Sequence, residues 1–277
     1  MTSDARAVES ALAFWADAGV DAAYADAPVD RMAEGLAALK PRAGVAAGAI
    51  SRTASSAAAA PTAIRPVEPQ TAVAVEDARA AAAAAGDLTA LEAAIAAFDG
   101  CALKFGGASQ AVFSRGAPDA PVMVIGEAPG AEEDVQGAPF VGRAGKLLDR
   151  MLGAAGLSDR VFITNTVFWR PPGNRNPSPA EQLVCAPFLE RAIQLVRPSL
   201  LLLAGGASAK SVLQRPEGIL SLRGRWFEWR SSDGSLEIPA LPTLHPAFLL
   251  RQPAAKKKAW DDLITLAERL DRPARHT

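Results

Sequence analysis

Cysteine is scarce in this chain of 277 residues, which contains only Cys101 and Cys185, far apart in the sequence. Two such residues cannot form the disulfide framework of a small secreted domain, and their scarcity is typical of a protein from a reducing cytosol. The sequence also shows no basic-then-apolar leader and no apolar run long enough to cross a bilayer. We therefore expect a cytoplasmic protein with no membrane segment.

An excess of charge of one sign is also absent, since the formal net charge is −1. This net charge gives no general sign of a nucleic-acid partner, although it is compatible with a local basic patch. Nearly half of the residues are apolar, which allows a sizeable core, but alanine inflates that share and buries little surface.

Composition divides the chain into three parts. Residues 1–40 mix acidic residues and alanine with a few large apolar side chains, and we expect an N-terminal helical segment there. Residues 41–75 are mainly Ala, Pro, Ser and Thr, which predicts a flexible linker. Residues 76–277 are expected to form one domain, which opens with helix-forming composition interrupted at Gly86-Asp87.

From about residue 100 the sequence alternates between short apolar runs and longer amphipathic stretches. Strands are expected over 122–125, 161–164, 200–204 and 238–242, and helices over 143–155, 179–196, 207–214 and 257–270. This alternation indicates an α/β fold, a three-layer α/β/α sandwich around a central, mainly parallel four-stranded sheet. The stretch from Leu220 to Ser235 is interpreted as a hairpin or an edge segment.

Four loop motifs follow the expected strands, at the edge of the sheet where open α/β folds bind ligands. The first, residues 126–145, is rich in glycine and acidic residues and ends in Pro-Phe-Val-Gly-Arg-Ala-Gly. The second, 164–177, runs from Thr-Asn-Thr to an Arg-Pro-Pro-Gly-Asn-Arg segment, and the third, 204–209, is a glycine turn that opens a helix. The fourth, 244–251, contains His245, one of only two histidines. The first turn lacks a Gly-x-Gly-x-x-Gly phosphate loop, which argues against a generic Rossmann-like nucleotide binder.

Over roughly residues 100–270 these motifs resemble the uracil-DNA glycosylase superfamily, in particular its family-4 type. The resemblance rests on the order Gly-Glu-Ala-Pro-Gly, Gly-Ala-Pro-Phe-Val-Gly, Arg-Pro-Pro-Gly-Asn-Arg and His-Pro-Ala-Phe-Leu-Leu-Arg. It implies an enzyme that flips uracil out of DNA and hydrolyses its N-glycosidic bond, leaving an abasic site for base-excision repair. The alternative is a glycosylase-fold protein that binds uracil-containing or abasic DNA with little turnover. The expected partner is DNA containing uracil, and the expected state is a monomer.

The resemblance also implies roles for individual residues. Phe140 offers a ring on which the base can stack, and Asn165 can pair with the N3–H and O4 edge of uracil. His245 can stabilise negative charge near O2, because donors aimed at developing charge are effective catalysts. Glu127 or Glu133 can position water or stabilise the sugar cation, and the sequence leaves that choice open. The implied uracil-binding set is Gly126, Ala128, Phe140 and Asn165.

DNA contacts are expected outside the base pocket. Leu249 is the candidate apolar wedge that fills the space left by the flipped base, with Arg251 beside it. The remaining candidates for contacts to DNA are Arg170, Arg175, Gly206 and Ser208. Structural interpretations compete with these roles: Phe140 and His245 can belong to the core, Asn165 can cap a turn, and the arginines can brace a loop.

The cysteines depart from the family pattern. Family-4 proteins bind a [4Fe–4S] cluster through four cysteines, and here Cys101 and Cys185 stand at the second and fourth positions while Phe98 and Trp169 stand at the first and third. Two thiolates cannot satisfy a cluster with Cys₄ ligation. We therefore expect no cluster, no other metal and no cofactor, with Phe98 and Trp169 filling the vacated volume.

Overall fold

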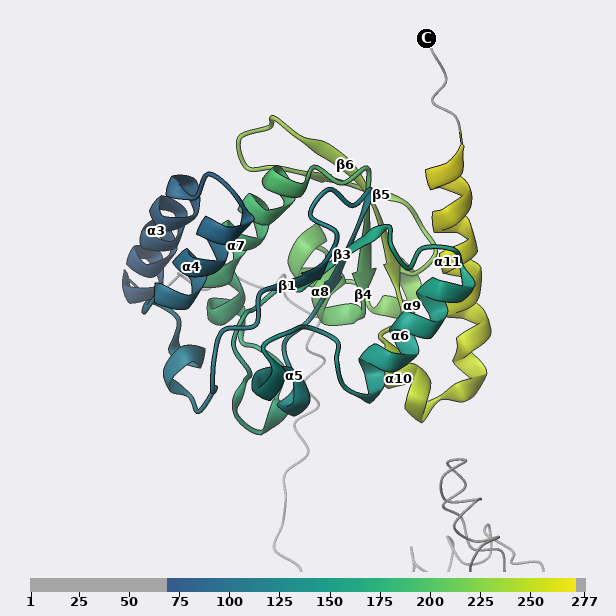
Figure 1. Ribbon diagram of the computed structural model, residues 1–277, viewed down its shortest axis with the longest axis horizontal. Coiled ribbons are helices and arrows are strands. Elements are labelled where there is room, and N and C mark those ends of the chain that lie inside the picture. Colours follow the sequence, from purple (N-terminus) through teal and green to yellow (C-terminus); the bar gives the residue numbers. More distant parts are fainter. Residues whose placement is uncertain (1–68, 273–277) are drawn as a thin grey trace, which may run out of the picture. The chain divides into compact units, whose positions relative to one another are not determined.

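A six-stranded sheet runs through the part of the chain that the computed structural model describes, residues 69–272 (Figure 1). Its four central strands are parallel and stand in the order β3 (Val161–Asn165), β2 (Val122–Gly126), β4 (Leu200–Ala204) and β6 (Glu237–Thr243). Antiparallel strands extend both edges, β1 (Ser114–Gly116) beside β3 and β5 (Phe227–Arg230) beside β6. The four parallel strands match the predicted sheet, and the edge strands enlarge it.

The central strands β2, β3 and β4 are mainly apolar because both faces of the sheet are covered. Every residue of β2, β3 and β4 is buried. In β2 the side chains alternate, so that Met123 and Ile125 belong to one apolar core and Val122 and Val124 to the other. The register pairs Gly126 with Asn165 and Ala204 with Thr243, so the carboxyl ends of the parallel strands share one edge.

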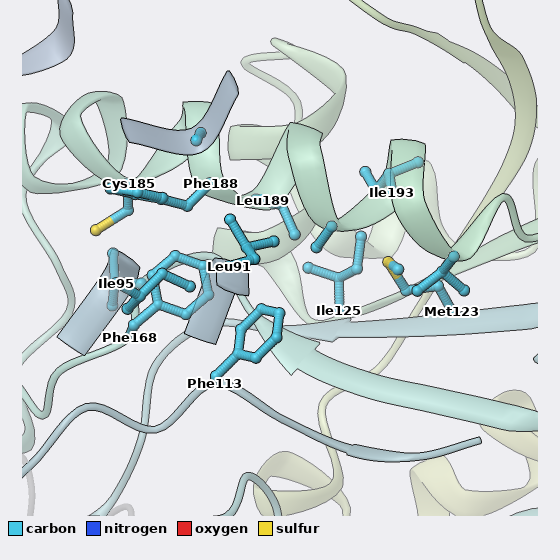
Figure 2. Packing of buried hydrophobic residues seen from close by; sticks show 14 of the residues in the cluster. Leu91, Ile95, Phe113, Met123, Ile125, Phe168, Cys185, Phe188, Leu189 and Ile193 are labelled. Atoms are coloured by element: carbon cyan, nitrogen blue, oxygen red, sulfur yellow. The ribbon is translucent and has the colours of Figure 1, made fainter. Parts of the chain in front are cut away.

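Different helices cover the two faces. The first core, drawn in Figure 2, includes residues of α7 (Pro179–Val196), α8 (Gly206–Leu213), α4 (Leu88–Ala97) and α3 (Pro69–Ala84). The second core includes residues of α6 (Arg143–Ala154) and α11 (Lys256–Asp271). This arrangement gives the three layers that the alternating pattern predicts (Figure 1).

Helix ends follow local sequence signals. Ser178 accepts a hydrogen bond from the Glu181 amide and the Glu181 carboxylate accepts one from Ser178, with Pro179 in the first helical turn of α7. Asp87 caps α4 and separates it from α3, which matches the interruption expected at Gly86-Asp87. Helix α3 begins at Pro69, inside the segment predicted as linker. The N-terminal helical segment predicted for residues 1–40 lies outside the described residues.

Short elements make up the loops at the carboxyl edge. They are α5 (Ala131–Gln136), α9 (Ile219–Leu222), α10 (Pro246–Arg251) and the 3₁₀ turns η1 (Ala102–Phe105), η2 (Pro172–Asn174) and η3 (Pro253–Ala255). The segment expected to be a hairpin or edge contains α9 and then β5, which pairs with β6. A search of the described helices found none with the length and apolarity needed to span a membrane.

Candidate active site

A cavity of about 510 Å³ opens at the carboxyl edge of the parallel strands. It is lined by residues of the first, second and fourth loop motifs, which are far apart in the sequence. The predicted site residues that line it are Glu127, Ala128, Glu133, Phe140, Asn165, Arg175, His245 and Arg251. The structure therefore brings together the residues expected to bind the base and those expected to act on it.

The floor of the cavity is a narrow slot at the ends of β2 and β3. A Cβ atom built on Gly126 would lie 2.4 Å from Asn165 Oδ1 and 2.5 Å from the Phe140 ring, so only glycine leaves this space open. Asn165 is 1% exposed, and its Oδ1 has no hydrogen-bond partner among residues 69–272. An unpaired buried acceptor is unfavourable, so the slot is prepared for a ligand that brings an N–H donor.

The two candidate carboxylates have different environments. Glu133 is saturated: its Oε1 accepts hydrogen bonds from the amides of Val141 (3.0 Å) and Gly142 (2.9 Å), and its Oε2 accepts one from Gly130 (3.1 Å). Glu127 Oε1 is buried without a partner among the described residues, and burial raises the pKa of this carboxyl above its ordinary value. Glu127 is thus the carboxylate with free capacity to take a proton or a water, while Glu133 holds backbone.

His245 is the N-cap residue of α10. Its Nδ1 accepts a hydrogen bond from the Ala247 amide at 3.1 Å. Burial lowers its pKa to about 4, with the positive charge of Arg251 acting in the same direction and the negative charge of Glu133 opposing it. The imidazole is therefore neutral at pH 7, and because Nδ1 is an acceptor, Nε2 carries the N–H.

Two neighbours fix the position of His245. Its ring centroid lies 5.6 Å from that of Phe140, so the two rings are adjacent walls of the cavity. Gly205 adopts φ +103°, and a Cβ there would lie 2.9 Å from the Cβ of His245. Sequence reasoning noted the glycine turn at this position but missed that Gly205 makes room for the histidine. The signal was the glycine pair itself, at the end of a buried strand.

Two of the predicted DNA contacts are not supported by the structure. Leu249 is 0% exposed, because it packs in a cluster with Leu147, Leu244 and Ala259. Ser208 is also 0% exposed, and its hydroxyl donates a hydrogen bond to the Ile125 carbonyl at 2.6 Å. Both side chains therefore stabilise the fold in this conformation and do not face the cavity.

Among the predicted arginine contacts, Arg170 and Arg175 hold loop residues, whereas Arg251 has no ion pair within the part of the chain that the structure describes. Arg175 lines the cavity, but its guanidinium donates to both carboxylate oxygens of Glu181 (2.8 and 2.6 Å). Arg170 donates to Asn174 Oδ1 at 2.7 Å. Arg251 is exposed at the cavity rim. Gly206 is the first residue of α8. Arg251 is therefore the best placed of these residues to meet a phosphate.

Sequence reasoning missed Phe248. In α10, residues three apart share a face, and His245, Phe248 and Arg251 all line the cavity. Phe248 is partly exposed, whereas its neighbour Leu249 is buried on the opposite side. The helical spacing from His245 was the signal that distinguishes the two, but a six-residue helix was not expected there.

Known proteins resemble this chain over the region that forms the cavity. Residues 113–264 match the family model described as the uracil DNA glycosylase superfamily. A type-4 uracil-DNA glycosylase of Sulfurisphaera tokodaii is 39% identical over 175 residues, which are 61% of this chain and 79% of the relative. The type-4 enzyme of Saccharolobus solfataricus is 41% identical (58% and 76% covered), and that of Thermotoga maritima is 41% identical (50% and 71% covered).

These relatives overturn the predicted absence of an iron–sulfur cluster. They are enzymes of the type for which the resemblance implies a [4Fe–4S] cluster, so two missing cysteines were not sufficient ground for predicting that this chain has none. The prediction that this chain has no iron–sulfur cluster is therefore wrong.

The cysteines themselves form one buried pair, with Cys101 Sγ 3.9 Å from Cys185 Sγ. Phe98 and Trp169 are buried in the same core. Within the described ranges no group of three or more His, Cys, Asp or Glu side chains could hold a metal ion. Cys101 and Cys185 would supply two of the four thiolates that such a cluster takes.

Proposed function

The chain belongs to the uracil DNA glycosylase superfamily and is a DNA glycosylase, and from this membership we propose how it acts on uracil in DNA. In the proposal, the enzyme flips uracil out of the helix, hydrolyses its N-glycosidic bond and leaves an abasic site for base-excision repair. The type-4 relatives support a uracil-DNA glycosylase function in general. The proposed substrate partner is uracil-containing DNA, and a cytoplasmic location and a monomeric state stay predictions.

The observation that carries the proposal is the unpaired, buried Oδ1 of Asn165 beside the ring of Phe140. Uracil presents an N3–H donor at its Watson–Crick edge, which can donate to this oxygen, whereas the N3 of cytosine is an acceptor. Cytosine would leave two acceptors facing each other in a buried site, at a cost of about 1–3 kcal/mol. Phe140 would stack on the face of the base that Asn165 holds by its edge.

Cleavage in this proposal breaks the bond between N1 of uracil and C1′ of the sugar. The electron pair goes to the base, and the negative charge is shared with O2, where the Nε2–H of neutral His245 donates a hydrogen bond. The sugar becomes oxocarbenium-like, and water attacks C1′. Glu127, with its unpartnered Oε1, accepts the proton that the water loses. Glu133 has a structural role in the loop instead, because its carboxylate already accepts hydrogen bonds from three backbone amides.

Contacts to DNA in this proposal come from the exposed face of α10. We assign the wedge to Phe248 in place of Leu249, because Phe248 lines the cavity and Leu249 is buried. Arg251 lies one turn further along the same face and would meet the phosphate backbone. The alternative, a protein that binds uracil-containing or abasic DNA with little turnover, would need the same slot but not the donor on His245.

The test is an excision assay with a labelled oligonucleotide that carries one uracil, beside matched strands with thymine or cytosine, followed by alkali to cut abasic sites. We expect cleavage of the uracil strand alone. The variant His245→Ala should lower kcat by about 10²–10³-fold, the usual loss for one donor at a developing anion, with little change in binding. Absence of cleavage by the wild type would contradict the proposal. Turnover that is equally low in the wild type and in H245A would favour the binding alternative.

A further inference from the structure

Phe140 has an unfavourable backbone conformation, with φ +55°. A residue other than glycine in the left-handed region is strained and persists only where its surroundings enforce it. The peptide is also crowded, since a Cβ on Gly145 would lie 1.7 Å from the Phe140 carbonyl oxygen. The base-stacking ring is therefore held by a backbone that other groups must stabilise.

The carbonyl side of this segment is held by Arg115, which lies in the edge strand β1. Its Nε donates to the Pro139 carbonyl at 2.7 Å, and its Nη2 donates to the Phe140 carbonyl at 3.1 Å. The same Nη2 contacts Asp149 Oδ1 of α6 at 2.6 Å. One planar guanidinium thus binds two consecutive carbonyls and a carboxylate, a geometry that a lysine ammonium cannot reproduce.

The amide side of the same segment is held by Glu133, whose Oε1 accepts from Val141 and Gly142, the two residues that follow Phe140. Two side chains of opposite charge therefore hold the backbone around Phe140 by hydrogen bonds. Arg115 donates to the carbonyls, and Glu133 accepts from the amides. Hydrogen bonds to charged groups are stronger than neutral ones, so these contacts stabilise the strained backbone at Phe140.

We propose that Arg115, aided by Asp149, is a positioning residue for uracil excision, which acts by fixing Phe140 against the base slot. Arg115 is not among the residues that line the cavity, so any effect on catalysis passes through Phe140 and its neighbours. This inference rests on the proposed function, because it gives Phe140 the task of stacking on the base. Without Arg115 the Phe140 ring is free to leave the slot, and the base is bound less often in the reactive position.

A double-mutant cycle tests this coupling. Excision of uracil is measured in single-turnover and steady-state assays for the wild type, Arg115→Leu, Phe140→Ala and the double variant. We expect R115L to lower kcat/KM by about tenfold or more, because a misplaced positioning group costs rates of this order. In the F140A background the same substitution should change kcat/KM by less than about twofold, since coupled residues are not additive.

The control is Arg160→Leu. Arg160 is a comparably exposed arginine that pairs with an aspartate, Asp271, at 2.7 Å, and it precedes β3 at the end of the strand away from the cavity. R160L should leave excision unchanged in both backgrounds. If R115L fails to fold, R115K replaces it: lysine keeps the charge but cannot hold both carbonyls, so it should restore only part of the rate and show the same dependence on Phe140.

These experiments distinguish the role of Arg115 from the glycosylase function itself. Equal losses from R115L in the presence and absence of Phe140, or wild-type activity in R115L, would overturn the role of Arg115 while leaving the glycosylase function intact. A wild type that excises no uracil would overturn the proposed function, and the inference with it. A Phe140-dependent loss in R115L, absent from R160L, supports both.

Discussion

His245 illustrates how the fold sets the charge of a side chain for which we propose a role in catalysis. The imidazole is uncharged at neutral pH because burial and the nearby Arg251 lower its pKa. Its Nδ1 is occupied by the Ala247 amide. The protein thus fixes both the protonation state and the tautomer before any substrate binds, and in the proposed mechanism the one N–H that results donates to the developing uracil anion.

We expect the His245 imidazole to titrate with a pKa of about 4, well below the ordinary 6.5. A titration followed by NMR of the imidazole signals measures this directly, and because the chain has only two histidines, a His245→Asn variant assigns them. A midpoint near 6.5 for His245 would contradict the burial argument. In that case its charge would change within the physiological range.

The same shift predicts a pH dependence of stability. Between pH 6.5 and about 4 the unfolded state binds a proton at His245 that the folded state does not, so the free energy of unfolding falls as the pH falls through this window. At about 1.4 kcal/mol per pKa unit the loss approaches about 3 kcal/mol. Urea unfolding at several pH values should show this loss in the wild type and a smaller one in H245N, which has no titrating ring.

Some residues of the site could be predicted from the sequence and others could not. Asn165, Phe140, Glu127 and His245 follow apolar strands in recognisable motifs, and the common edge of a parallel sheet brings such positions together. Arg115 gave no signal, because its partners lie 24 to 34 residues away and meet it only in the folded chain. The choice between the two glutamates also depends on hydrogen bonds that no spacing reveals.

At the scale of elements, α10 shows how helical spacing decides which residues line the cavity. Helical spacing puts Phe248 and Arg251 on the cavity side with His245, while Leu249 packs into the core. The sequence predicted a loop motif here, and the family resemblance gave Leu249 as the wedge. The six residues of α10 that follow His245 are too few to give a periodic pattern, so the sequence did not show which side chains face the cavity.

The pair Phe248→Ala and Leu249→Ala separates these roles. F248A should fold normally and should lower excision from duplex DNA by about tenfold or more, with a smaller effect on single-stranded DNA, which has no stack to refill. L249A removes a fully buried side chain, so it should lower the free energy of unfolding by about 2–5 kcal/mol. Urea unfolding and excision assays on both substrates make the comparison, and a harmless F248A beside a stable, duplex-defective L249A would restore the original assignment.

The central elements were predictable for a different reason. The apolar runs of β2, β3 and β4 are buried on both faces, and α7 carries a complete N-terminal signal from Ser178 to Glu181. Strand β1 is only three residues long and partly exposed, so it has neither length nor alternation to mark it. Such an edge strand forms because its backbone N–H and C=O groups pair with those of the neighbouring strand, here β3. This pairing depends on the assembled sheet and leaves no signal in the local sequence.

At the scale of the whole chain, helix α3 shows where the glycosylase domain begins. The sequence placed its beginning at residue 76, after a linker, but α3 starts at Pro69 and buries Ala78 and Ala82 against the helical layer. Arg191 of α7 also donates two hydrogen bonds to the Ala85 carbonyl, at 3.0 and 2.7 Å. We propose that α3 is part of the glycosylase domain and that the domain begins at its first turn.

Two truncated chains test this boundary. A chain that begins at residue 69 keeps every described contact, so it should unfold at the same temperature as the full chain and excise uracil at the same rate. A chain that begins at residue 88 loses α3, uncovers part of α7 and frees Arg191 from its carbonyl partner. A loss of even about 1 kcal/mol would lower its unfolding temperature by roughly 2–4 °C, while the cavity residues, all beyond residue 126, should keep the excision rate of the folded fraction. Reduced activity in the longer of the two would instead give residues 1–68 a part in engaging DNA, and unchanged stability in the shorter one would remove α3 from the domain.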